Sequence, residues 1–109
     1  MAYDEGLAQR VREILEEQPD FREKNMFGGI AFLLRGNMVS GIIGDALIIR
    51  VGPDSYEATL KRPHARKFDL TGRPMKGWVM VSSEGCESDE DILAWIQKGV
   101  NHALSLPAK

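Results

Sequence analysis

A cluster of cationic side chains between residues 61 and 76 has the clearest chemical character in the sequence. Against a single carboxylate, Asp69, stand six cations and one histidine: Lys61, Arg62, His64, Arg66, Lys67, Arg73 and Lys76. The planar guanidinium group matches phosphates and carboxylates in a two-pronged geometry, and a row of cations can neutralise nucleic-acid phosphates. The pattern therefore indicates a candidate site for an anion or a partner, comprising Arg50, His64, Arg66, Lys67, Arg73 and Lys76.

An acidic segment offers these cations a different use. Five carboxylates follow closely on one another: Glu84, Glu87, Asp89, Glu90 and Asp91. Contact between the two segments would neutralise both, as clustered charges commonly do. The formal net charge of the chain is −2, which gives it little long-range attraction for a polyanion. We therefore expect the acidic segment to clamp the basic one, and we regard nucleic-acid binding as an alternative that is not favoured.

Arg50 stands apart because it lies within an apolar, β-rich run. Alternation along a strand would place it on the same face as Ile48. An unpaired arginine is rarely buried, so we expect an ion pair with Asp69. A further alternative is an enzyme whose site surrounds Arg50, His64 and Asp69, which would require all three side chains in one cleft.

The remaining nucleophilic and metal-ligating residue types form no catalytic pattern. His64 and His102 have no histidine or cysteine partner at ligand spacing. Cys86 has two glutamates nearby that oppose its thiolate form. Gly28 and Gly29 precede a strand pattern rather than the helix that follows a phosphate-binding loop. We therefore expect no catalytic activity, no metal and no cofactor.

Apolar residues recur at helical spacing near both ends of the chain. The first stripe covers residues 7–15, where Asp4 can cap the helix and Pro19 ends it. The last helix is expected to begin at Ser88 with a capping box, and its stripe continues until Pro107. Two helices are thus expected to bracket the segment that carries the cations.

Between these helices, short β-rich runs separated by glycine indicate an antiparallel meander. Two-residue turn signals at 36–37 and 44–45 leave no room for parallel crossovers. A short helix opens at Pro53, and an ordered loop covers 62–76. The expected strands are 29–35, 38–43, 46–51, 78–81 and, more weakly, 22–26. The fold class is therefore α+β: a meander of three or four strands plus one later strand, packed with N-terminal, short middle and C-terminal helices.

Four short motifs resemble the TfoX/Sxy N-terminal domain family, and the resemblance runs from Tyr3 to the last helix. The motifs are Met26-Phe27-Gly28-Gly29, Arg50-Val51-Gly52-Pro53, Arg62-Pro63-His64-Ala65-Arg66 and Gly72-Arg73-Pro74-Met75-Lys76-Gly77-Trp78. The resemblance implies a bacterial α+β domain without established catalysis. Founding members of the family regulate DNA uptake and natural transformation, and they carry a second, helical domain that we do not expect here. The leading expectation is a non-enzymatic regulatory or protein-interaction domain.

Length and composition limit the remaining possibilities. A chain of 109 residues suits one domain, residues 1–109. A single cysteine excludes an internal disulfide and fits a reducing compartment. No apolar run is long enough for a membrane helix or a signal peptide. We therefore expect a cytoplasmic protein with no membrane contact.

Two expectations concern packing. One residue from each main element should be buried in the core: Leu15, Phe32, Ile49, Trp78 and Ile96. A sheet in so small a domain leaves an edge or an apolar face that a second copy often covers. We therefore expect a homodimer, in which the residues partly exposed on the monomer are Met38, Ile42 and Ile43.

Overall fold

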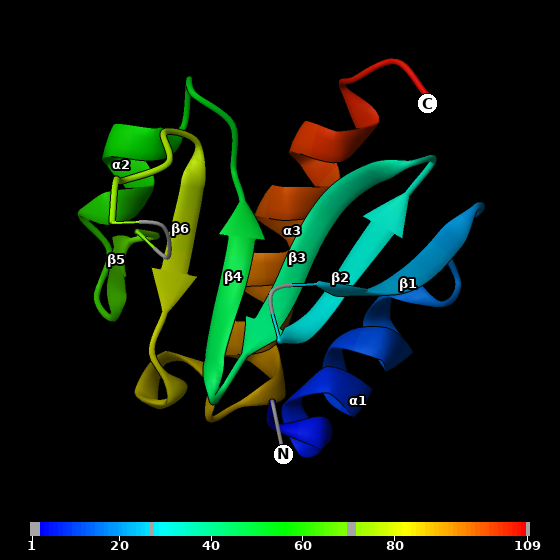
Figure 1. Cartoon of the computed structure of the whole chain (residues 1–109), viewed down its shortest axis with the longest axis horizontal. Coiled ribbons are helices and arrows are strands. Elements are labelled where there is room, and N and C mark those ends of the chain that lie inside the picture. Colours follow the sequence, from blue (N-terminus) through cyan, green and yellow to red (C-terminus); the bar gives the residue numbers. More distant parts are fainter. Residues whose placement is uncertain (1–2, 27, 70–71, 109) are drawn as a thin grey trace.

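A six-stranded antiparallel sheet in the order β1-β2-β3-β4-β6-β5 organises the chain (Figure 1). The structure is a computed structural model that describes residues 3–26, 28–69 and 72–108. The strands are β1 (Phe21–Met26), β2 (Gly29–Leu34), β3 (Asn37–Ile43), β4 (Ala46–Arg50), β5 (Ala65–Lys67) and β6 (Trp78–Val81). The helices are α1 (Glu5–Leu15), α2 (Tyr56–Leu60) and α3 (Asp89–Leu104), with a 3-10 turn η1 (Ser83–Cys86). The α+β class predicted from the sequence is confirmed.

Tight turns join the strands of the meander. The turn between β2 and β3 lies at Arg35 and Gly36, whose φ angles of 55° and 84° are both left-handed, as the favoured hairpin turn requires. This turn is one residue earlier than predicted, because Asn37 already belongs to β3 and its side-chain amide donates to the Pro107 carbonyl at 2.9 Å. The second turn lies at residues 44–45, as predicted.

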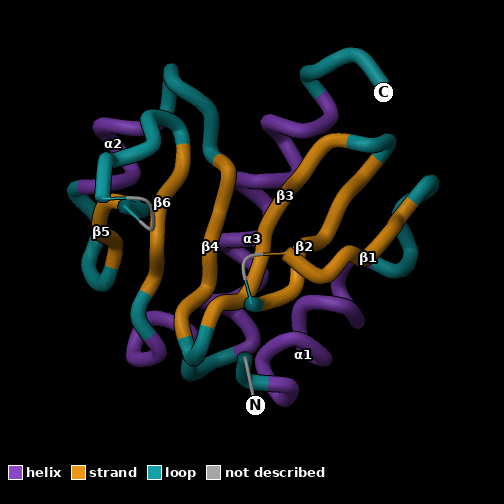
Figure 2. Tube along the Cα trace, in the orientation of Figure 1, coloured by secondary structure: helices purple, strands orange, loops and turns teal. Residues whose placement is uncertain are grey.

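Helices α1 and α3 pack on one face of the sheet, and Figure 2 shows α3 passing behind β3 and β4. The caps follow the sequence: the Asp4 carboxylate accepts from the Leu7 amide, and the Ser88 hydroxyl accepts from the Asp91 amide. The core lies between these two layers. Four of the five residues predicted to be buried are fully buried in this core: Leu15, Phe32, Ile49 and Ile96.

The fifth predicted core residue, Trp78, lies elsewhere. It is half-buried on the opposite face of the sheet, because strand alternation gives the core to its neighbours Val79 and Val81 instead. The exposure predicted for a dimer interface is also partly wrong. Ile42 is fully buried on the core face, whereas Met38 and Ile43 are half-buried.

The segment after β4 differs most from the sequence prediction. Helix α2 begins at Tyr56 rather than at Pro53, because residues 53–55 form a turn. The predicted loop over 62–76, of which 70–71 lie outside the described residues, contains strand β5, which pairs with β6 at the edge of the sheet. At the end of α3, Leu104 is 45% exposed rather than buried. No helix of the described residues is long and apolar enough to cross a membrane.

Candidate functional site

The sheet face opposite α1 and α3 contains an apolar pocket. Its volume is about 190 Å³, larger than an engineered cavity of about 150 Å³ that binds benzene. It can therefore accept one large apolar side chain or a small apolar molecule. The lining comes from five strands and from the segment after β5: Met26, Ile30, Ala31, Met38, Gly41, Ile43, Ile48, Phe68, Met75 and Trp78.

The strands create this pocket because they are apolar on both faces. In β4, the core receives Leu47 and Ile49, while Ile48 points to the opposite face and is still only 1% exposed. A sheet with one solvated face normally shows alternation of apolar and polar residues, whereas continuous apolar runs mark strands covered on both faces. Residues 30–34 and 46–49 are such runs. This is the signal from which sequence reasoning could have found the site.

Part of the segment that the sequence assigned to anion chemistry forms a wall of the pocket. Phe68 is 3% exposed, and its ring centroid lies 6.3 Å from that of Trp78. The Met75 amide donates to the Phe68 carbonyl at 3.0 Å, and the Trp78 amide donates to the Met75 carbonyl at 3.0 Å. These bonds hold Met75 against the pocket. Arg73 and Lys76, which lie on either side of Met75 in the sequence, are exposed.

Arg50 and Arg66 form a cationic margin on one side of the pocket. Arg50 is paired with Trp78 across the strands, and its guanidinium carbon lies 5.4 Å from the indole centroid, a cation–π distance. Arg66 faces Met80, which in turn faces Ile48 on the same sheet face. The predicted pairing of Arg50 with Asp69 is wrong. Asp69 is exposed and makes no ion pair among the described residues, and the Arg50 guanidinium lies over the Trp78 indole instead.

A second cationic margin lies on β1, and sequence reasoning missed it. Lys24 faces Ala31, which lines the pocket. Arg22 faces Leu33, and Leu33 faces Met38 in the next strand. Residues opposite one another in a sheet share a face, so both cations stand beside the pocket. Only the strand register reveals this, because β1 is otherwise exposed and polar.

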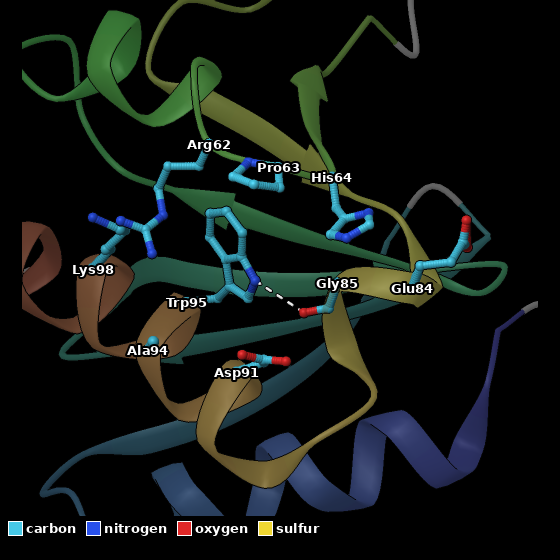
Figure 3. A pocket seen from close by; sticks show the side chains of 9 residues that line it. All are labelled: Arg62, Pro63, His64, Glu84, Gly85, Asp91, Ala94, Trp95 and Lys98. Carbon is cyan, nitrogen blue, oxygen red and sulfur yellow. Dashed lines mark hydrogen bonds between the residues drawn. The ribbon is translucent and has the colours of Figure 1, made fainter.

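His64 and Lys67 belong to neither cationic margin. Lys67 faces Val79, a residue of the core face. His64 has a left-handed φ of 69° and lines a separate cavity of about 270 Å³. Figure 3 shows that cavity around the indole of Trp95, with Arg62 and Lys98 at one end and His64 and Glu84 at the other.

Trp95 is fixed at the centre of this second cavity. Its indole N–H donates to the Gly85 carbonyl at 3.1 Å, and the Arg62 guanidinium carbon lies 5.4 Å from its ring centroid (Figure 3). Arg50 and Asp69 do not line this cavity, and His64 does not line the apolar pocket. The three residues proposed for an enzyme site therefore line neither of these two cavities together.

The clamp predicted between the basic and acidic segments contains no ion pair among the described residues, although residues of both segments, such as His64 and Glu84, line one cavity. The two ion pairs within residues 3–26, 28–69 and 72–108 are Arg10–Asp89 at 2.7 Å and Arg12–Glu23 at 2.6 Å. Asp89 is thus paired with α1 rather than with the basic segment. The pKa of Glu84 is lowered mainly by the hydrogen bond from the Ser83 hydroxyl, and the charges of His64 and Arg66 contribute less.

The single cysteine is buried, which changes the reason for its low reactivity. Burial raises the pKa of the Cys86 thiol to about 11, the Asp91 charge adds to the increase, and Arg10 opposes it. The sequence argument from neighbouring glutamates therefore named the wrong groups, since burial is the main cause and the contributing carboxylate is Asp91. Among the described residues, no three side chains of the metal-ligating types are grouped closely enough to hold a metal ion.

The comparison with known protein families agrees with the motifs. Residues 13–103 match the TfoX N-terminal domain, a span that contains all six strands and every residue that lines the apolar pocket. No curated protein and no solved structure matches the chain. The match covers most of the 109 residues, and the chain therefore belongs to the TfoX N-terminal domain family.

Proposed function

We propose that the chain is a non-enzymatic regulatory domain that binds a partner protein through the open face of its sheet. The observation that carries the proposal is the apolar pocket on the face opposite α1 and α3. Contiguous apolar surface that a monomer leaves uncovered commonly marks an interaction site. Strands that are apolar on both faces are typical of a sheet with a layer on each side, and this chain supplies one of the two layers.

The chemistry of the lining favours a protein over a nucleic acid. Three methionines, Met26, Met38 and Met75, line the pocket, and flexible, polarizable methionines are common on surfaces that adapt to peptide partners. Nucleic-acid sites instead combine phosphate contacts with aromatic rings free to stack on bases. The aromatic ring at the margin, Trp78, already lies beneath Arg50. Nucleic-acid binding by the cations of this face is the alternative that the experiment must exclude.

A homodimer through this face remains a prediction of the sequence. Charge makes a second copy of the chain a less favoured partner for this face than a different protein. A twofold interface brings the same patch of both copies together. It would oppose the cations beside the pocket, Arg22, Lys24, Arg50 and Arg66, with their own copies. Like charges that face each other across an interface are unfavourable.

The test is co-purification from cells with the tagged wild-type chain and with two variants. The pocket variant carries Met38→Gln and Ile43→Gln, two half-buried positions on the open face. The control is Leu93→Gln on α3, which is 48% exposed on the helical side. We expect a specific protein, insensitive to nuclease, that the wild type and the control retain and the pocket variant loses.

Three results would overturn the proposal. One is that no specific protein co-purifies. Another is that the pocket variant retains the partner as well as the wild type does. The third is that nucleic acid, rather than protein, accounts for the captured material. Light scattering on the same three chains checks self-association, and a dimer that only the pocket variant loses would assign the face to a second copy.

A further inference from the structure

We propose that the partner segment on the open face is an acidic amphipathic helix that inserts one large apolar side chain into the pocket. The inference rests on the proposed function, namely that this face binds a protein. It adds the secondary structure and the charge of the segment that binds. Three features carry it: the pairing of the floor strands, the width between the cationic margins, and the distribution of charge.

The backbone of the floor offers no hydrogen-bonding groups to an extended partner on this face. Strands β2, β3 and β4 are each paired on both sides, so their amide and carbonyl groups are already bonded within the sheet. An extended segment lying on the face would leave its own polar backbone groups without partners. A helix satisfies these groups internally. It would cover this face as a third layer, just as α1 and α3 cover the other face (Figure 2).

The width of the face suits one helix. Neighbouring strands are about 4.8 Å apart, so β1 and β4, three steps apart in the sheet, are separated by about 14 Å. A helix with its side chains is about 10 Å across. It fits between Arg22 and Lys24 on β1 and Arg50 on β4, with most of the pocket beneath it, while Arg66 lies two strands further along the sheet, on β5.

The charges of the two margins determine which residue types should flank the apolar stripe of that helix. None of the four margin cations forms an ion pair in the described part of the chain. Two carboxylates are engaged on the helical side: Glu23 is bonded to Arg12 of α1, and Asp89 to Arg10. Two others are nearer to this face, because Asp69 follows the pocket residue Phe68 and the charge of Arg66 acts on Glu84. Acidic residues on both sides of an apolar stripe would therefore meet a cation on each margin, and complementary charge sets specificity and association rate.

The test uses two synthetic helices of about 16 residues that carry the same leucine and phenylalanine stripe, flanked by glutamate in one and by lysine in the other. Binding is measured by anisotropy of a labelled peptide against the wild-type chain. A charge-reversed chain carries Arg22→Glu and Lys24→Glu, both at exposed positions. The matched control is Lys61→Glu, an exposed lysine at the end of α2.

We expect the wild type to bind the glutamate helix about tenfold more tightly than the lysine helix, since each exposed pair adds a modest amount. The preference should weaken between about 50 mM and about 500 mM salt. The charge-reversed chain should lose it, and the control should keep it. Equal binding of both helices, or no binding of either, would overturn the inference.

The failure of the inference can be told apart from that of the proposed function. A cellular partner that the pocket variant loses and the charge-reversed chain retains would support the docking face and refute the acidic helix. A partner that both variants lose, together with the glutamate preference, supports both proposals. If an oligonucleotide of the same charge competes as well as the glutamate helix, the cations recognise phosphate and the helix proposal is wrong.

Discussion

Replacement of Gly99 by alanine should destabilise the domain, although helix propensity predicts the opposite. Alanine is the better helix former by about 1 kcal/mol, and Gly99 lies within α3. However, a Cβ at Gly99 would lie 2.6 Å from the Val39 carbonyl oxygen and 2.9 Å from its Cγ1. Ordinary contact begins near 3.4 Å, so α3 and β3 must separate by about 0.8 Å.

Whether the change in the free energy of unfolding is a gain or a loss depends on whether the Val39 carbonyl can move. Val39 is fully buried in β3, which is paired on both sides, so its carbonyl cannot rotate away as the end of a side chain could. Overpacking a core costs about 1–3 kcal/mol, and a rigid backbone neighbour places the cost near the upper end. After the gain in propensity, we expect Gly99→Ala to lower the free energy of unfolding by about 1–2 kcal/mol.

The assay is urea unfolding followed by circular dichroism. The control is Ala94→Gly, at an exposed position of the same helix, which should cost about 1 kcal/mol through propensity alone. If Gly99→Ala instead stabilises the domain by as much as Ala94→Gly destabilises it, then α3 does not approach the sheet at this residue and the helical layer is seated differently.

Three further predictions concern single side chains. Phe32→Ala should lower the free energy of unfolding by about 3–5 kcal/mol, because Phe32 is fully buried and stacks on Phe21 with centroids 6.1 Å apart; an unchanged urea midpoint would contradict this. Cys86 should react slowly with Ellman's reagent at about pH 8 in the folded chain and rapidly in denaturant, because its thiol is buried with a raised pKa; equal rates would refute its burial. Burial, aided by the Arg50 charge, lowers the pKa of His102 in the folded state. The stability linked to His102 is therefore present above its unfolded pKa of about 6.5 and decreases as pH falls below that value, so urea midpoints should drop less on acidification in His102→Gln than in the wild type.

Local signals in the sequence were sufficient for most of the fold. The caps at Asp4 and Ser88 were predicted correctly, because a cap involves residues only three positions apart. The meander followed from short turns, which permit only antiparallel neighbours. Strand β5 could not be predicted in this way. Its three residues, Ala65–Lys67, carry no periodicity, and they become a strand only because β6 lies beside them.

The candidate site was less predictable than the fold. Phe68, Met75 and Trp78 are close together in sequence, but the pocket also needs Met26 of β1 and Met38 of β3, which are distant in sequence and lie on the same face of the sheet. Trp78 was assigned to the core because a large aromatic residue in a strand is usually buried there, whereas alternation gives the core to Val79 and Val81. The continuous apolar runs in β2 and β4 carried the missing information, because they indicate a second face that must be covered.

The net charge of −2 does not describe either face of the sheet, because it is a sum over the whole surface. Charges are screened over about 8 Å at physiological salt, whereas the domain extends about 30 Å in each direction. A segment on the open face therefore experiences Arg22, Lys24, Arg50 and Arg66 far more strongly than the carboxylates on the helical side. The strand register, rather than the composition, places these cations around an apolar pocket. In the acidic-helix proposal, the distribution of charge over the two faces of the sheet, rather than the net charge, selects the partner.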